Sequence, residues 1–403
     1  MTRTIAPTTP SKGQSVSLLV VAEFAAMSLW FSAAAVLPEM LREAPLSAWR
    51  QATLASAVQA GFVIGALGIA MTGVADRFDP RRVFAISAVL AAFANLALLV
   101  VPVGHGLAIA LRALTGALLA GVYPVGMKIA VGWGQRDRGL LVGLLIGALT
   151  LGAASPHLIS LLGGADWRST IVVTSILAAL GALLMAGVRL GPLHATAGAF
   201  RLSAIGTAWT NRRIRLAYFG YFGHMWELYV MWAWIGVAMT QAYAMSLPAE
   251  AASELAKLTA FLAIGIGGLS CVVAGLIADR IGRIEVAALS MVASGIAALA
   301  TAATFGGPPW LTFTLVIVWG AAVIADSAQF SAVVSDFAPR DLAGSLLTLQ
   351  TALGFLLTAI TIQLAPLAAN AFGWPATIAA LAAGPAFGVA AMLWLRRMVA
   401  AGN

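Results

Sequence analysis

Long apolar runs, each close to the length that crosses a bilayer, follow one another along this chain of 403 residues. Charged residues make up 9% of the chain and hydrophobic residues 61%, whereas a soluble globular protein carries about 25% charged residues. So few charges cannot cover a surface that faces water, and intrinsic disorder requires high charge with low hydrophobicity. The sequence therefore predicts an all-α membrane protein.

Clusters of charged residues, Gly, Pro and Asp divide the apolar sequence into twelve runs. We expect membrane-spanning helices at residues 17–38, 51–74, 83–102, 107–132, 140–162, 169–190, 216–240, 254–278, 284–304, 310–334, 343–367 and 375–395. Because Glu23 lies inside the first run, where a cleaved signal peptide would be uncharged, we interpret that run as a span. The longest polar stretch, 191–215, predicts a cytoplasmic linker between two six-helix bundles at 1–190 and 216–403.

The basic residues are distributed unevenly between the loops. Most of the 23 Lys and Arg residues lie at the termini or in alternate short loops. By the positive-inside rule, this asymmetry predicts a bacterial inner-membrane protein with both termini in the cytoplasm. The net charge of +8 then reflects topology, and we expect no nucleic-acid partner. Because Cys271 is the single cysteine, an intrachain disulfide and a cysteine metal cluster are both excluded.

The two halves of the sequence repeat each other. Landmarks recur at a nearly constant shift: Glu23 with Glu227, Met27 with Met231, Trp30 with Trp234, Asp76-Arg77 with Asp279-Arg280, Arg136-Asp137 with Arg340-Asp341, and Trp167 with Trp374. Internal repeats are characteristic of transporter folds. Since six spans per half is an even number, both repeats enter the membrane from the same side and are related by an axis along the membrane normal.

Short motifs add a family resemblance to this pattern. The loop motif G-x-x-x-D-R-x-G-R is intact at Gly275, Asp279, Arg280, Gly282 and Arg283. The fourth and fifth spans carry further motif residues at Arg112, Gly116, Gly143, Gly152 and Pro156. On these residues the chain resembles the major facilitator superfamily of secondary transporters over nearly its whole length. It departs from the antiporter form of the fifth-span motif at Ser155-Pro156-His157.

The resemblance implies a fold of twelve transmembrane helices in two pseudo-symmetric bundles. It also implies that the first, fourth, seventh and tenth spans line a central cavity that opens alternately to the two sides. A cytoplasmic latch is expected from charged loop residues, namely Asp76, Arg77, Arg136, Asp279, Arg280, Arg283 and Arg340. Exposed ion pairs contribute only ~0–1 kcal/mol each, which suits a latch that must reopen.

Ionisable side chains at membrane depth are costly unless they are paired or hydrated, so each is a functional candidate. We expect proton coupling from Glu23, Glu227 and Asp326, with a permanently paired structural acid as the competing interpretation. Arg112 either binds a substrate carboxylate, adjusts a neighbouring acid or pins two helices, and Lys128 is expected to extend to the interface. Substrate binding is expected from Trp30, Arg112, Tyr123, His157, His224, Met231, Trp234, Gln329 and Gln350.

Together these features predict a proton-coupled secondary transporter of a small organic solute, working as a monomer without cofactor or resident metal. Efflux of a drug-like or amphipathic compound fits Glu23 and the aromatic residues. Uptake of an organic anion fits Arg112 and the altered end of the fifth-span motif. A transition-metal carrier and a membrane enzyme rank below these, because the 13 Met residues are scattered and no Walker A, H-E-x-x-H or nucleophile-elbow motif occurs.

Overall fold

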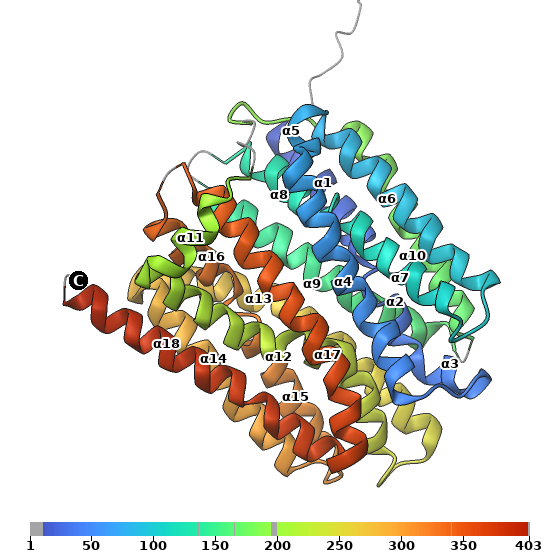
Figure 1. Ribbon diagram of the computed structural model, residues 1–403. Helices are drawn as coiled ribbons and strands as arrows, with labels where there is room; N and C mark the ends of the chain where they lie inside the picture. The colour runs from blue at the N-terminus through green and yellow to red at the C-terminus, as the bar shows by residue number, and fades with distance from the viewer. Residues whose placement is uncertain (1–10, 135–136, 165, 195–199, 340, 402–403) are drawn as a thin grey trace, which may run out of the picture.

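The computed structural model describes residues 11–134, 137–164, 166–194, 200–339 and 341–401. Helices account for nearly all of this part of the chain, which contains no strand. The helices run roughly side by side along the long direction of the molecule, as Figure 1 shows. Those of the first half are α1 Lys12–Met27, α2 Ser32–Ala35, α3 Leu37–Glu43, α4 Ala48–Thr72, α5 Val74–Arg77, α6 Pro80–Leu96, α7 Gly106–Leu119, α8 Tyr123–Val131, α9 Arg138–Leu162 and α10 Trp167–Leu184.

The second half repeats this arrangement after a connecting segment. Part of the predicted linker 191–215 is helical, because it contains α11 and the start of α12. The helix α11 packs against α12 and α17. The helices are α11 Ser203–Thr210, α12 Arg212–Tyr243, α13 Ala249–Ile281, α14 Arg283–Ala303, α15 Pro309–Val323, α16 Ser327–Phe337, α17 Ala343–Leu381 and α18 Ala383–Ala400.

Nine helical stretches of the described chain are long and apolar enough to cross a membrane. One of them, Ala343–Ala400, holds two crossings, because Gly373 has a φ of 82° and interrupts the helix. The first predicted span is divided among α1, α2 and α3, and the seventh is α12, a helix of 32 residues. These two crossings complete the twelve that the sequence predicts.

Three spans that the sequence predicts as continuous, at 17–38, 107–132 and 310–334, are interrupted near their middles. The breaks lie between α1 and α2, between α7 and α8, and between α15 and α16. A broken helix leaves backbone carbonyl groups without partners inside the membrane, so other groups must satisfy them. The breaks therefore bring side chains with donor groups to the centre of the fold.

The loops rich in arginine lie at one end of the helices, which we call the basic end. It carries α5, α11 and the segments before α9 and α17, at the upper left of Figure 1. The other end, which carries α3, is called the opposite end. The two halves meet along two pairs of long helices, α4 with α17 and α9 with α13. If the positive-inside prediction holds, the basic end faces the cytoplasm.

Candidate functional site at the junction of the two halves

Arg112 of α7 fills the break in the first span. Its Nη atoms donate to the backbone oxygens of Leu29 at 3.1 Å and Trp30 at 2.6 Å. They also donate to the Ser32 hydroxyl and to Asn95 Oδ1, both at 3.0 Å. The side chain is 1% exposed. The guanidinium thus satisfies the carbonyl groups that the end of α1 releases, which corresponds to the helix-pinning interpretation of this residue.

Asn95 of α6 extends the network of Arg112, although it was not among the predicted site residues. Its Nδ2 donates to the backbone oxygen of Ile171 at 3.3 Å and to the Ser175 hydroxyl at 3.0 Å, both on α10. An Asn inside an apolar span is the sequence signal that could have identified it. Four spans of the first half are therefore joined through one buried polar cluster.

Glu23 of α1 is fully buried, and neither of its carboxyl oxygens has a hydrogen-bond partner among the described residues. Its carboxyl group occupies the space above Gly126 of α8, where a Cβ atom would collide with Oε2 and would lie 3.3 Å from the ring of Phe84. A carboxylate in apolar surroundings is costly. The site can hold this group most readily when it is neutral.

Glu227 of α12, the repeat partner of Glu23, is also buried but has two donors. The Ser294 hydroxyl of α14 donates to Oε2 and the Trp319 indole of α15 donates to Oε1, both at 2.7 Å. Neither donor was predicted from the sequence: Ser294 lies on the ninth span, which was not expected to line the cavity, and Trp319 was not among the residues singled out on the tenth span. The carboxyl group of Glu227 is therefore held within the second half by both of its oxygens.

Asp326 lies in the break between α15 and α16 and contacts His224 of α12. The distance between His224 Nδ1 and Asp326 Oδ1 is 2.8 Å, and the two side chains are 1% and 2% exposed. The Cys271 thiol donates to the backbone oxygen of Ile324 at 3.2 Å in the same break. Asp326 does not pair with Arg112, because the guanidinium of Arg112 is engaged in the first half.

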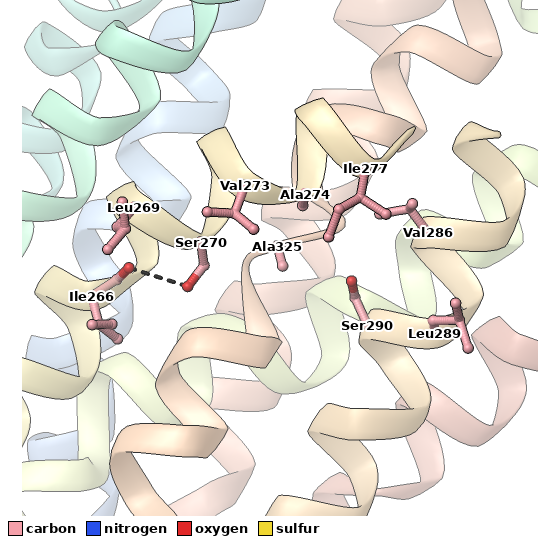
Figure 2. A pocket seen from close by; sticks show the side chains of 10 residues that line it. All are labelled: Ile266, Leu269, Ser270, Val273, Ala274, Ile277, Val286, Leu289, Ser290 and Ala325. Atoms are coloured by element: carbon pink, nitrogen blue, oxygen red, sulfur yellow. Dashed lines mark hydrogen bonds between the residues drawn. The ribbon is translucent and has the colours of Figure 1, made fainter. Parts of the chain in front are cut away.

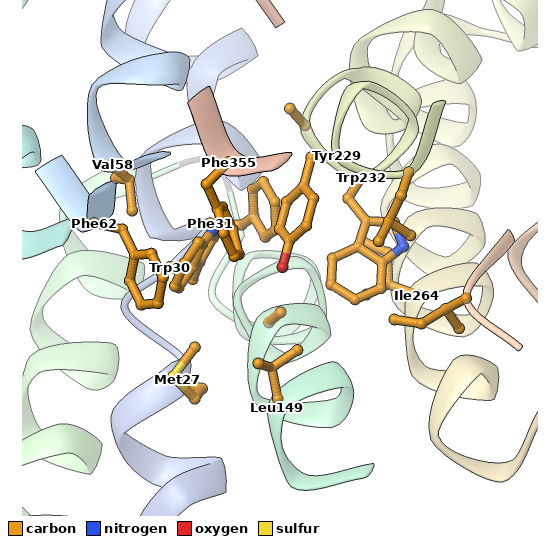
Figure 3. Packing of buried hydrophobic residues seen from close by; sticks show 14 of the residues in the cluster. Met27, Trp30, Phe31, Val58, Phe62, Leu149, Tyr229, Trp232, Ile264 and Phe355 are labelled. Atoms are coloured by element: carbon orange, nitrogen blue, oxygen red, sulfur yellow. The ribbon is translucent and has the colours of Figure 1, made fainter. Parts of the chain in front are cut away.

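A cluster of aromatic rings fills the junction between the halves. We call it the aromatic cluster, and its members are Trp30, Phe31, Phe62, Tyr229, Trp232 and Phe355. Figure 3 shows these rings facing one another, with Met27 and Leu149 beside them. Three of the residues come from the first half and three from the second. Each is at most 5% exposed.

Within the aromatic cluster, rings from opposite halves are in direct contact. The ring centroids of Phe62 and Phe355 are 4.6 Å apart, and those of Trp30 and Phe355 are 5.6 Å apart. Tyr229 lies 6.0 Å from Trp30 of the first half and 5.0 Å from Phe355 of its own half. Aromatic pairs at such separations contribute about 0.5–1.5 kcal/mol beyond their burial. The aromatic rings of the two halves therefore pack directly against one another at the junction.

The other predicted substrate residues are dispersed around this junction. The Trp234 indole donates to the backbone oxygen of Ile362 at 3.1 Å, so it faces α17 within the second half. Gln350 is 1% exposed, and its amide atoms have no hydrogen-bond partner among the described residues. Met231 and Gln329 are buried, whereas Tyr123 at the start of α8 is partly exposed. Of these residues, Gln350 alone combines deep burial with an unsatisfied side chain.

His157 of α9 reaches the neighbouring half. It is 2% exposed, its Nε2 has no partner among the described residues, and its Cε1 lies 3.5 Å from the position of a Cβ atom on Gly236 of α12. The absence of a side chain at Gly236 makes room for the imidazole ring. His157 is thus an interface residue, at the contact between α9 and α12.

The predicted latch residues pair within their own halves wherever a partner is seen. Lys128 of α8 reaches Asp76 and also donates to the backbone oxygen of Ala75 at 2.9 Å, so it does more than extend to the interface. Arg283 pairs with Asp336 at 2.6 Å. Arg77 lies in α5, Asp279 and Arg280 are exposed near the end of α13, and Arg136 and Arg340 lie outside the described residues. A latch between the halves stays a prediction.

A groove on the outer side of the second half does not contribute to this site. It encloses about 400 Å³ between α13 and α14, with Ala325 at its floor, as Figure 2 shows. Its lining is apolar apart from Ser270, which donates to the backbone oxygen of Ile266 at 3.2 Å, and Ser290. Without a charged group in its lining, the groove is an apolar surface between membrane spans.

Comparisons with known proteins agree with this arrangement. A family model described as Major Facilitator Superfamily matches residues 19–361, and no curated protein matches the chain. Among solved structures, a mutant of the nucleoside transporter NupG is similar at 15% identity and a TM-score of 0.72, covering 94% of this chain and 99% of that one.

Two further structures are similar over comparable lengths. A D-xylose-proton symporter gives 17% identity and a TM-score of 0.71, with 94% of this chain and 96% of that one covered. The xylose transporter XylE from E. coli, in a partially occluded inward-open conformation, gives 16% identity and a TM-score of 0.71, with 96% of this chain and 99% of that one covered. At such identities the likeness concerns the fold, and it confirms the predicted helical membrane fold with twelve spans.

Proposed function

Because this chain belongs to the Major Facilitator Superfamily, it is a multi-pass membrane transporter and not an enzyme, and we propose that it exports amphipathic aromatic solutes in exchange for protons. In this proposal the protein is a monomer in a bacterial inner membrane, with the basic end in the cytoplasm. The halves open the junction alternately to the two sides, and the solute binds between them.

The aromatic cluster is the observation that carries this proposal. Its rings come from α4, α12, α17 and the break in the first span, so they would separate when the halves move apart. Flat π surfaces bind planar rings and also attract organic cations. A planar, positively charged solute would replace the contacts that the rings now make with each other.

The placement of the cationic side chains weighs against uptake of an organic anion. Arg112 is surrounded by acceptors of the first half, and Lys128 is paired with Asp76. An anion entering the junction would have to take either cation away from the acceptors that it already contacts. Among the described residues, no group of three His, Cys, Asp or Glu side chains could hold a metal ion, which gives a metal carrier no support.

Glu23 is the proposed proton carrier. It lies one helical turn from Met27, which is next to the aromatic cluster, and its carboxyl oxygens have no partner in the described part of the chain. Opening the junction would admit water to the carboxyl group and stabilise the ionised form, whereas closing would favour the neutral form. Proton release and uptake would then follow the movement that exposes and covers the solute.

Flux into proteoliposomes with an imposed pH gradient tests the proposal. We expect transport of ethidium, a planar aromatic cation, and no transport of benzoate, the matched aromatic anion. Trp30→Ala should abolish ethidium transport, while Trp310→Ala, at a ring that is 70% exposed at the edge of the fold, should leave it unchanged. Glu23→Gln should bind ethidium in a thermal-shift assay but fail to accumulate it. Transport of benzoate without ethidium would contradict the proposal.

A further inference from the structure

The polar contacts seen between the two halves gather at the opposite end. Gln363 of α17 donates to the Thr53 hydroxyl at 3.1 Å and accepts from the Ser56 hydroxyl at 3.0 Å, both on α4. At the other pair of interface helices, α9 and α13, Lys257 of α13 contacts Glu39, which lies on the short helix α3 of the first half. These contacts close the same end of the junction at two places.

Glu39 and Lys257 form a buried ion pair between the halves. Lys257 Nζ lies 2.6 Å from Glu39 Oε1, and the side chains are 12% and 2% exposed. Lys257 also donates to the backbone oxygen of Ser160 on α9 at 3.4 Å. The neighbours Val36 and Leu37 are 0% and 1% exposed. Water is therefore excluded from the Glu39 carboxylate and has little access to the Lys257 ammonium group while the halves are together.

The ion pairs at the basic end have a different arrangement. Each of those seen there joins two residues of one half, namely Lys12 with Asp137, Lys128 with Asp76, Arg81 with Asp79, Arg283 with Asp336, and Arg396 with Glu285. One more, Arg201 with Asp341, joins the linker to the second half. These pairs stabilise the individual halves and can remain in place when the halves move.

We propose that Glu39 and Lys257 are positioning residues that hold the halves together at the opposite end, so that the resting transporter receives solute from the basic end. The inference rests on alternating access in the proposed function, and it depends neither on the identity of the solute nor on proton coupling. Each transport cycle must then break this pair and form it again.

The energetics of a buried ion pair suit such a gate. The attraction between two buried charges is largely offset by the loss of their hydration, so an intact pair adds little net stability. When the gate opens, both charges regain water and the cost of separation stays small. Removing only one partner is different, because the other charge is then buried alone in the closed state. Single substitutions should therefore shift the protein toward the state that is open at the opposite end.

Cysteine accessibility in the full-length protein tests the gate without any solute. The parent carries Cys271→Ala, which removes the single cysteine, and Ser56→Cys, because Ser56 lies on α4 in the α4–α17 pair and is 7% exposed. A membrane-impermeant maleimide is added from the opposite side. We expect Glu39→Gln to raise the labelling rate about tenfold, equivalent to about 1.4 kcal/mol in the equilibrium between closed and open states.

Two further variants distinguish opening of the gate from a general loosening of the fold. Glu43→Gln is the matched control, because Glu43 pairs with Arg168 at the same end but within the first half, and it should label like the parent. The exchange of Glu39→Lys with Lys257→Glu restores opposite charges across the junction and should return labelling close to the parent rate. If Glu39→Gln does not fold, Lys257→Gln takes its place, and it should also label faster because it leaves the Glu39 carboxylate buried without its partner.

Two kinds of labelling result would overturn the inference. Labelling of Glu39→Gln, or of Lys257→Gln, at the parent rate would show that the pair does not hold the halves together. An equal rise in Glu43→Gln, or no recovery in the charge exchange, would show a general loss of structure. Since labelling needs no transported compound, failure of ethidium export would leave this result unaffected.

Discussion

The carboxyl groups of Glu23 and Glu227 occupy corresponding positions in the two halves, yet among the residues that the structure describes only Glu227 receives hydrogen bonds, from Ser294 and Trp319. The repeat therefore preserves the acid but not its surroundings. One acid is free to change its protonation without losing a partner, and the other is not. The predictions below follow from this difference and from other contacts of the buried polar groups.

Glu227→Gln should lower stability more than Glu23→Gln. A Gln amide turns an NH₂ group toward either Ser294 or Trp319, which leaves a buried donor unsatisfied at a cost of about 1–3 kcal/mol. Glu23 has no such bond to lose. Thermal unfolding of both variants in detergent measures the difference. Equal losses of stability would mean that the two carboxyl groups have the same structural role.

Arg112→Ala should be strongly destabilising. It leaves the backbone oxygen of Trp30 without its donor and removes one of the donors to the Leu29 oxygen and to Asn95 Oδ1. A buried unsatisfied group costs about 1–3 kcal/mol. Arg112→Lys should recover only part of this loss, because an ammonium group lacks the planar fork that reaches several acceptors. Unfolding temperatures test whether stability decreases from wild type to Arg112→Lys and again to Arg112→Ala. If Lys is as stable as wild type, the helix-pinning role is wrong.

Gly126→Ala should destabilise the protein through its contact with Glu23. A Cβ at Gly126 collides with Glu23 Oε2, and overpacking of this kind typically costs about 1–3 kcal/mol. Adding Glu23→Ala makes room and should recover much of the loss, which a double-mutant cycle on unfolding temperature measures. Gly68→Ala in α4 is the control, since its Cβ meets no atom within 4 Å. Additive effects of the Gly126 and Glu23 changes would contradict the contact.

Acid should weaken the loop contact around Glu43. Hydrogen bonds from Arg168 and Trp167 hold the pKa of Glu43 below its ordinary value of 4.5. A lowered pKa means that the ionised form stabilises the fold above the unfolded-state pKa, and that this contribution disappears as the pH falls through the folded-state pKa. Unfolding temperatures measured on descending pH should fall less steeply for Glu43→Gln than for wild type. Parallel curves would exclude a contribution from this carboxyl group.

The number and approximate position of the spans could be predicted from the sequence, because apolar length and loop charge are local properties of the chain. The repeat likewise identified Glu23 and Glu227. The breaks in the first, fourth and tenth spans could not be predicted, since residues such as Leu29 and Ile324 are ordinary in helices. The first and tenth breaks exist where distant groups, the Arg112 guanidinium and the Cys271 thiol, satisfy the exposed carbonyl groups.

The helix faces that meet across the junction also could not be predicted from the sequence. Phe62 and Phe355 are two among 17 Phe residues, and their spacing does not reveal that they lie in contact. Lys257 had a usable signal, since it is a charge inside the predicted span 254–278, but its partner Glu39 follows the end of the first predicted span. The pair becomes visible only when α3 and α13 are brought together.

The unbroken α12 has a mechanical consequence. At 32 residues, it is about 48 Å long at 1.5 Å per residue, well beyond the roughly 30 Å of bilayer hydrocarbon. Its first residues extend beside α11, where Arg212 stacks on the Trp394 ring at 4.7 Å. The same helix carries Tyr229 and Trp232 of the aromatic cluster. A displacement of the segment that joins the halves would therefore be transmitted along α12 to the aromatic cluster.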